Sequence, residues 1–253
     1  AMFDEVDEGT AMFKITDIKA KLPIQANDRL VSLYIDVVNV PSDGYLKLAD
    51  QTQKMLDGTI ALTSVIPITP PSVDLYVKAN GNNNGGRTEA NAFSTVDAAV
   101  AAATDGDRIY IVGAISQTST VDVTKSLTFQ GMNTAVITGS TARLFNVTTA
   151  SKTISFSDIT FQSVVVSATA TGGAILNQNV ASDLSFTNCI FSNNTAKAAG
   201  GALNVTLGNL TITNCRFSNN SSPGNGGAIN FTGINLTISG SVFLENSTTA
   251  GNG

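Results

Sequence analysis

The second half of the sequence has few charged side chains, and these are the residues that could cleave glycosidic bonds. That chemistry needs paired carboxylates, or an acidic calcium cluster with a basic residue nearby. Asp158 and Asp183 do not occupy matching positions, and the absence of histidine removes Ser/His and Cys/His nucleophile systems. We therefore expect no catalytic residues. The charged residues from 127 to 253 are Arg143, Lys152, Asp158, Asp183, Lys197, Arg216 and Glu245.

Two acidic stretches carry the oxygen ligands that calcium prefers. One is the run at 4–8, and the other is Asp105-Gly106-Asp107. A solvated linker for the first and a plain turn for the second are the interpretations that we favour. The prediction is therefore no cofactor, with calcium as the alternative. The acidic run consists of Asp4, Glu5, Asp7 and Glu8.

The elements that would position any such residue follow from a repeat in the last part of the chain. Four similar lines are spaced by 30, 26 and 26 residues. A period of this size, built from short strands, predicts a solenoid of stacked coils. The lines are ISFSDITFQSV (154–164), LSFTNCIFSNN (184–194), LTITNCRFSNN (210–220) and LTISGSVFLEN (236–246).

Each line predicts two strands that meet at a bend. Apolar residues alternate with polar ones in both strands, so that one side faces a core. Between the strands lies Asp, Asn or Gly, the types that best tolerate a positive φ. The fold class is thus all-β, a right-handed parallel β-helix. The bend column is Asp158, Asn188, Asn214 and Gly240; the inward columns are Ile154, Leu184, Leu210 and Leu236, then Phe156, Phe186, Ile212 and Ile238, then Ile159, Cys189, Cys215 and Ser241, then Phe161, Phe191, Phe217 and Phe243.

Two further motifs recur with the strands. The phenylalanines of the last column should stack as an aromatic ladder, and Asn194, Asn220 and Asn246 should form an amide stack that satisfies its own hydrogen bonds. Paired glycines followed by a small and a large apolar residue suit a tight turn into an inward strand. These turns are GGAI (172–175), GGAL (200–203) and GGAI (226–229).

Cys189 and Cys215 lie one repeat apart at equivalent positions. Stacked strands are about 4.8 Å apart, and disulfides accept Cα separations of about 4.4–6.8 Å, so a bridge is conceivable. We favour two free thiols in an inward ladder. Two thiols with no histidine do not complete a zinc shell.

The combination of FSNN with GGAL and GGAI resembles the FxxN and GGA[ILV] repeats of chlamydial polymorphic membrane protein passengers, over roughly residues 154–253. Those are β-helical surface proteins implicated in adhesion. The resemblance implies a secreted bacterial adhesin, associated with the outer membrane or cell surface. The first line departs from the pattern because it carries FQSV in place of FxxN. Similar repeats occur in other large bacterial surface proteins.

The start of the solenoid is predicted upstream. Residues 93–107 favour a short capping helix, with Ser94 as N-cap and Asp97 in the first turn. Strands follow over 108–115 and 126–131, and Leu127, Phe129 and Gly131 match the later apolar and bend columns. The stretch from Tyr76 resembles the start of pectate-lyase-like β-helices of bacterial surface proteins.

The predicted domains are a β-rich module over 1–70 and the β-helix over 71–253. The first resembles cadherin-like or immunoglobulin-like adhesin modules, although 70 residues are short for such a sandwich. Because the sequence stops within a turn motif, we expect a longer parent chain, and we expect the uncapped end to stack or aggregate.

The net charge of −5 without a basic stripe argues against nucleic acid, and no apolar run approaches a membrane span of about 18 residues. We expect an extracellular, non-catalytic adhesin, with the β-helix as a stalk or a binding wall for carbohydrate or another surface receptor. The alternatives are a fragment of a polysaccharide lyase or glycosidase and, less favoured, an ice-binding protein. Ice binding would need paired hydroxyl ranks, and one rank is evident: Ser155, Ser185, Thr211 and Thr237.

Overall fold

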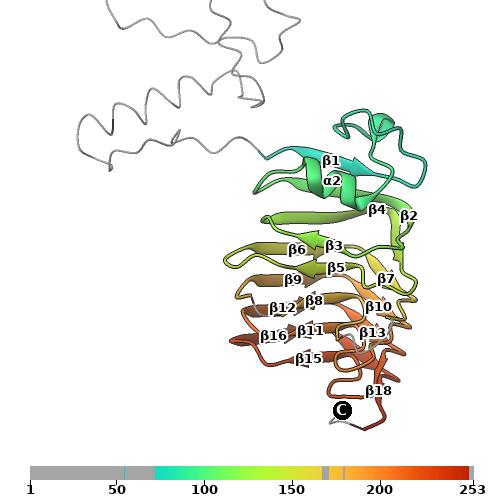
Figure 1. The fold of residues 1–253 in the computed structure, drawn as a ribbon, viewed down its shortest axis with the longest axis vertical. Helices are drawn as coiled ribbons and strands as arrows, with labels where there is room; N and C mark the ends of the chain where they lie inside the picture. Colours follow the sequence, from blue (N-terminus) through green and yellow to red (C-terminus); the bar gives the residue numbers. More distant parts are fainter. Residues whose placement is uncertain (1–53, 55–71, 167–170, 179, 251–253) are drawn as a thin grey trace, which may run out of the picture. The chain divides into compact units, whose positions relative to one another are not determined.

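A computed structural model of the protein describes Lys54 and residues 72–166, 171–178 and 180–250. Residues 72–253 belong to one compact unit, in which parallel strands stack in successive layers (Figure 1). The parallel β-helix expected from the repeat is therefore confirmed. Apart from Lys54, the module predicted over 1–70 lies outside the described residues, as does the acidic run at 4–8, and both stay predictions.

The largest sheet of the described residues has 11 strands and two arms. Each late coil places one strand in the first arm, turns, and places a shorter strand in the second arm, whereas two early strands run through both. The first arm contains β1 (Asp74–Val77), β2 (Arg108–Ser116), β4 (Leu127–Thr138), β6 (Thr153–Ser157), β9 (Asp183–Thr187), β12 (Asn209–Thr213) and β16 (Asn235–Ser239). The second contains the ends of β2 and β4 with β7 (Thr160–Gln162), β10 (Ile190–Ser192), β13 (Arg216–Ser218) and β17 (Val242–Leu244).

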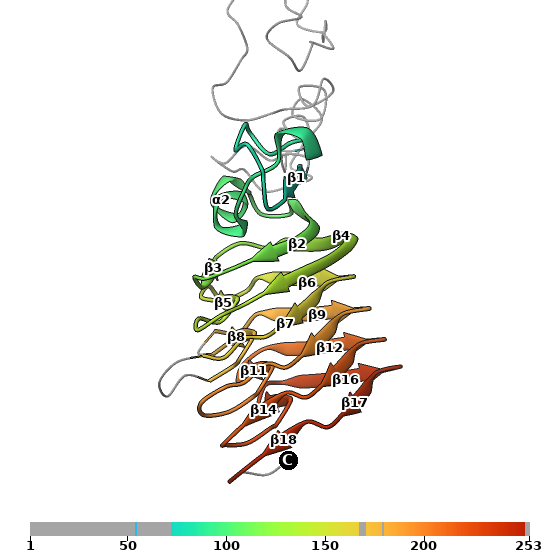
Figure 2. The ribbon, with the colours of Figure 1, turned by 90° about the vertical axis from the view of Figure 1, so that its right-hand side faces the viewer.

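A second parallel sheet closes each coil, and a two-stranded ladder lies at the corner between the two sheets. Figure 2 shows the strands stacked at regular intervals along the long axis of this unit. The five strands of the second sheet are β3 (Val121–Val123), β5 (Phe145–Val147), β8 (Ile175–Asn177), β11 (Leu203–Val205) and β15 (Ile229–Phe231); the corner ladder pairs β14 (Ser221–Ser222) with β18 (Ser247–Thr248).

The predicted bend column is confirmed in the four repeats. Asp158, Asn188, Asn214 and Gly240 have φ values of 58°, 54°, 53° and 59°. This left-handed conformation turns the chain sharply, and Asp and Asn adopt it more readily than most other side chains. The bend therefore separates the first arm from the second at the same place in successive coils.

The bend predicted at Gly131 is wrong. Gly131 lies inside β4, and the left-handed residues of that coil are Asn133 and Thr134. Between the pairs Gln130↔Ser157 and Val136↔Thr160, β4 has five residues where the next coil has two, so the turn shifts along the chain. Glycine is needed at 131 for another reason, because a Cβ there would lie 1.9 Å from the carbonyl oxygen of Asp158.

The predicted aromatic ladder is confirmed in the second arm. Successive ring centroids along Phe161, Phe191, Phe217 and Phe243 are 4.8, 4.6 and 4.8 Å apart, with interplanar angles of 19°, 4° and 4°. A second stack runs through the first arm, where the Phe156 centroid is 4.8 Å from that of Phe129 and 5.2 Å from that of Phe186. The rings of both stacks are fully buried before the last coil, so that the interior is filled by two neighbouring stacks.

The predicted amide stack is also confirmed. Asn194 Nδ2 donates to Asn220 Oδ1 at 3.0 Å, and Asn220 Nδ2 donates to Asn246 Oδ1 at 2.9 Å. Each amide also donates to a carbonyl of the preceding coil, as Asn220 does to Phe191 O at 3.0 Å. In the first repeat, which diverges from the others, the corresponding position is Val164. Its backbone N–H donates to Asn194 Oδ1 at 3.2 Å.

The glycine pairs form the tight turns that their spacing predicts. Gly200 has φ +67°, a conformation that favours glycine. Gly201 packs against the next coil so closely that a Cβ would lie 2.0 Å from Gly227 O. The pair therefore sets both the turn and the close approach of neighbouring coils.

A short helix covers the first end of the core, as predicted, but its cap differs. In α2 (Val96–Ala102) the N-cap is Thr95, whose Oγ1 accepts from Ala98 N at 3.2 Å; the prediction of Ser94 is wrong by one residue. Ser94 instead donates to Asn83 Oδ1, through its backbone N at 2.8 Å. The helix buries Val96, Ala99 and Val100, and the 3-10 turn η3 (Glu89–Asn91) lies in the loop before it.

Candidate functional site

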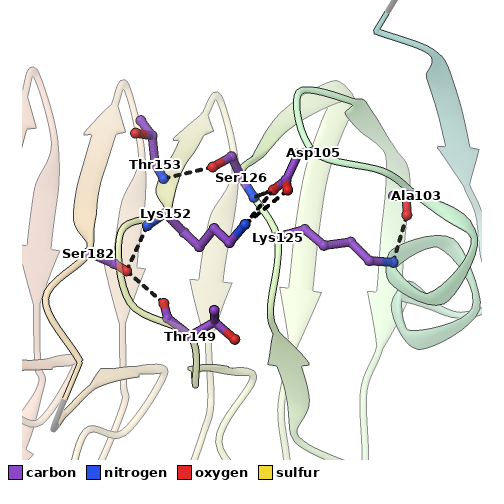
Figure 3. A network of polar contacts seen from close by, with 8 residues as sticks. All are labelled: Ala103, Asp105, Lys125, Ser126, Thr149, Lys152, Thr153 and Ser182. Carbon is purple, nitrogen blue, oxygen red and sulfur yellow. Dashed lines mark hydrogen bonds and ion pairs between the residues drawn. The ribbon is translucent and has the colours of Figure 1, made fainter. Parts of the chain in front are cut away.

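Asp105, Ser126 and Lys152 form a network of polar contacts between coils near the cap, here called the structural lock (Figure 3). Asp105 Oδ1 accepts from Ser126 N at 2.6 Å, and Lys152 Nζ lies 2.9 Å from Asp105 Oδ2. The Ser126 backbone N–H first, and Lys152 second, lower the pKa of Asp105 below its ordinary value of 3.8. The lock continues through Ser182, whose Oγ accepts from Lys152 N and donates to Thr149 O.

The other residues of this turn also hold the cap. The buried Asp107 accepts from Val73 N and Thr104 N, both at 2.7 Å. Lys125 Nζ donates to Ala103 O at the end of α2 (Figure 3). The turn expected at Asp105-Gly106 is present. In the described part of the chain no three His, Cys, Asp or Glu residues gather as a metal site. The prediction of no cofactor, with calcium as the alternative, stays a prediction.

The two acids weighed for catalysis are far apart along the strand direction. Asp183 is in register with Thr153, and Asp158 lies five residues after Thr153. At 3.3 Å per residue, the two aspartates are therefore separated by about 16 Å along the strand direction. Inverting glycosidases hold their carboxyl groups within about 9.5 Å. Asp158 accepts from Gln130 Nε2 at 2.6 Å, and Asp183 accepts from Asn209 Nδ2 at 2.7 Å. Both carboxylates thus bond to amides of neighbouring coils.

The cysteines are free and buried, as favoured from the sequence. Cys189 N donates to Cys215 Sγ at 3.4 Å, and Cys189 Sγ lies 3.4 Å from Thr187 O. The hydrogen bond with Cys215, together with burial, raises the pKa of the Cys189 thiol. Because the thiolate is the reactive form, this buried thiol is unsuited to nucleophilic chemistry.

The outward residues of β6, β9, β12 and β16 form three polar ranks, here called the polar wall. Ranks lie two residues apart along the strand, about 6.6 Å, and successive coils are about 4.8 Å apart. The predicted hydroxyl rank is the middle one. The ranks are Thr153, Asp183, Asn209 and Asn235; Ser155, Ser185, Thr211 and Thr237; and Ser157, Thr187, Thr213 and Ser239.

Hydrogen bonds fix side chains within the polar wall. Ser155 Oγ donates to Thr128 Oγ1 at 3.1 Å, which extends the middle rank to β4. In the first rank Asn235 Nδ2 donates to Asn209 Oδ1 at 2.8 Å. The first and third ranks were missed in the sequence, although their period-2 spacing from the predicted rank was a usable signal. The wall therefore presents partly ordered hydroxyl and amide groups.

The polar wall continues into an aromatic and charged cluster on β1 and β2. Tyr76 pairs with Tyr110, Asp74 pairs with Arg108, and these two columns run on into Gln130 and Thr128 of β4. The tyrosine rings stack with centroids 4.9 Å apart. This cluster was also missed, although the alternation in DLYV and RIYI already puts Leu and Ile on one face and Tyr on the other.

The outward face of the second arm is irregular by contrast. Ile190 and Val242 on this face are 39% and 47% exposed, next to Thr160 and Arg216 of the same column. At the last described coil, Leu236, Ile238 and Phe243 are also partly exposed and line a hollow. Stacking through that end stays a prediction.

Comparisons with protein-family models, with curated proteins and with solved structures found no match. The similarity to chlamydial polymorphic membrane proteins therefore stays a resemblance of motifs. Among the described residues, no helix has the length and apolar character needed to cross a membrane.

Proposed function

We propose that this protein is a non-catalytic, extracellular adhesin of a bacterial surface, and that the polar wall binds carbohydrate. The observation that carries the proposal is the register of the wall, in which three polar ranks repeat over four coils. A ligand with repeating hydroxyl groups, such as a polysaccharide, can meet such a surface at many equivalent points. Several weak contacts then add up to useful affinity.

The charge distribution supports binding rather than bond cleavage. Asp183 belongs to the polar wall but has no second carboxylate in register, because its partners there are Thr153 and Asn209. General acid–base cleavage of a glycoside needs two such groups. A polysaccharide-degrading enzyme is therefore the weaker interpretation, and release of sugar would revive it.

The test is incubation of the purified chain with an immobilised panel of polysaccharides and host glycans, with and without calcium. The expected result is retention of the protein without released sugar. Calcium-dependent retention would support the alternative role of the acidic stretches. Absence of retention on the whole panel would contradict the adhesin, and sugar release would contradict the non-catalytic assignment.

A matched pair of variants ties retention to the polar wall. The double variant T187V/T213V removes two hydroxyls of the third rank while keeping β-branched side chains that suit strands. Thr160→Val removes one hydroxyl by the same kind of substitution on the outward face of the second arm. Retention should fall for the wall variant and stay unchanged for the control.

Ice binding is a second candidate because the wall has the paired hydroxyl ranks that such a function would need. Ser185 and Thr187 of β9, and Thr211 and Thr213 of β12, are the paired positions on adjacent strands. Thermal hysteresis of the full chain, compared with T187V/T213V, separates this function from glycan retention. Hysteresis that the double variant loses, without glycan retention, would favour ice.

A further inference from the structure

The cluster at the head of the polar wall contains Tyr76, Tyr110, Asp74 and Arg108. Its residues occupy outward positions of β1 and β2, in the same columns as Gln130 and Thr128. The two rings are stacked at 23° and are half-buried, while the Asp74 and Arg108 side chains are about half exposed. The columns that carry hydroxyls and amides further along thus begin with aromatic rings and a pair of opposite charges.

The hydrophobic core does not require these tyrosines. The alternate residues of the same strands, Leu75, Val77, Ile109 and Ile111, are 0–3% exposed and already fill the interior. Smaller polar side chains occupy the matching outward positions in later coils. A cross-strand tyrosine pair does stabilise a sheet, but that role needs neither the arginine nor the carboxylate.

The guanidinium is held beside the rings. Arg108 Nη1 donates to the Tyr110 hydroxyl at 3.2 Å, and Arg108 Cζ lies 5.8 Å from the Tyr110 centroid. Asp74 Oδ1 is 3.9 Å from Arg108 Nη1, which is longer than a direct hydrogen bond. The arginine therefore keeps donors, and the aspartate keeps acceptors, for a further partner.

We propose that this cluster is a subsite for a neutral sugar at the head of the polar wall; the inference rests on the proposed carbohydrate-binding function. Two neighbouring sugar hydroxyls can donate to Asp74 and accept from Arg108, while the apolar C–H surface of the sugar packs against the tyrosines. Binding sites combine such apolar surface with a few placed polar groups. The opposite charges of the pair favour a neutral sugar over a charged one.

The geometry also accommodates an oligomeric ligand. From β1 to β16 the first arm includes six steps between neighbouring strands, about 29 Å at 4.8 Å per step. One sugar covers only the cluster, whereas a chain can continue over Gln130 and Ser157 along the third rank. The cluster would then supply the strongest single contact and the ranks would supply the repeated weaker ones.

The experiment is affinity electrophoresis of the full chain through gels that contain a neutral polysaccharide from the panel, and through matched gels with an acidic one. The variants are Tyr110→Ala and Arg108→Lys, with Arg216→Ala on the second arm as control. The expected result is a roughly tenfold weaker affinity for each cluster variant, the equivalent of one charged hydrogen bond or one stacking contact. The control should match wild type, and thermal unfolding checks that every variant is folded.

The outcomes separate the inference from the function on which it rests. If wild type binds neutral polysaccharide and both cluster variants bind it equally well, the subsite is wrong and the polar wall alone accounts for adhesion. If wild type binds acidic polysaccharide alone, the neutral assignment is wrong. If wild type binds no glycan, the proposed function fails and the subsite fails with it.

Discussion

The two arms of the large sheet share one interior and differ on their outward faces. Inside, Phe156 and Phe186 stack in the first arm as Phe161 and Phe191 do in the second. Outside, the first arm carries three regular polar ranks, whereas the second mixes apolar, polar and charged residues. Burial thus requires large apolar side chains inside both arms, but it does not require a regular outward face. That regularity is what a binding surface would explain.

The largest expected effect concerns the shared interior. Phe186→Ala and Phe191→Ala should each lower the free energy of unfolding by about 3–5 kcal/mol, because both rings are fully buried in stacks. Urea unfolding measures the loss, and Ile190→Ala, on the exposed side of β10, is the matched control at about 0.5 kcal/mol. If only one of the two phenylalanine variants lost stability by this amount, the two arms would not contribute equally to the interior.

The amide stack at the end of the second arm should have the next largest effect. Asn220→Ala removes the acceptor of the buried Asn194 backbone N–H and the side-chain donor to the Phe191 carbonyl, so it should cost about 2–3 kcal/mol. Asn219→Gly is the control, since Asn219 is exposed with φ 55° and glycine accepts that conformation. If both variants unfold at the same urea concentration as wild type, the amide stack does not stabilise the corner.

A smaller effect concerns the lock beside the first arm. Asp105 has a lowered pKa, so its contribution to stability is present above the pKa of the unfolded state, near 3.8, and is lost as the pH falls through the lower folded pKa. Wild type should be more stable than Asp105→Asn at pH 6, by less than about 1 kcal/mol for an exposed pair. The two should converge in thermal unfolding as the pH falls below 3.8. A difference that stays constant from neutral to strongly acidic pH would count against this role.

The sequence predicted the features that repeat at 26 residues. The Phe column, the amide stack and the left-handed bends all follow from residue types that recur in register, because stacked coils present equal environments to equal positions. The early coils lack that support. The extra residues after Gln130 moved the bend from Gly131 to Asn133. Thr95 has the extended backbone and the side-chain contact of a cap, whereas the Ser94 hydroxyl donates to Asn83.

The surface was harder to predict than the interior. Thr187 and Thr213 were visible in the sequence as alternate residues of their strands, but their rank became evident only once the coil register was known. Tyr76 and Tyr110 belong to segments that share no repeat, so only strand pairing brings them together. Outward residues obey no packing rule as strict as that of the core, and their grouping has to come from the fold.

The most direct test of the account is glycan retention of wild type, T187V/T213V and Thr160→Val on one panel, with urea unfolding of the same samples. The account predicts that all three unfold within about 0.5 kcal/mol of one another, and that the polar-wall variant alone loses retention. Equal retention by the three folded proteins would contradict the polar wall as the binding surface.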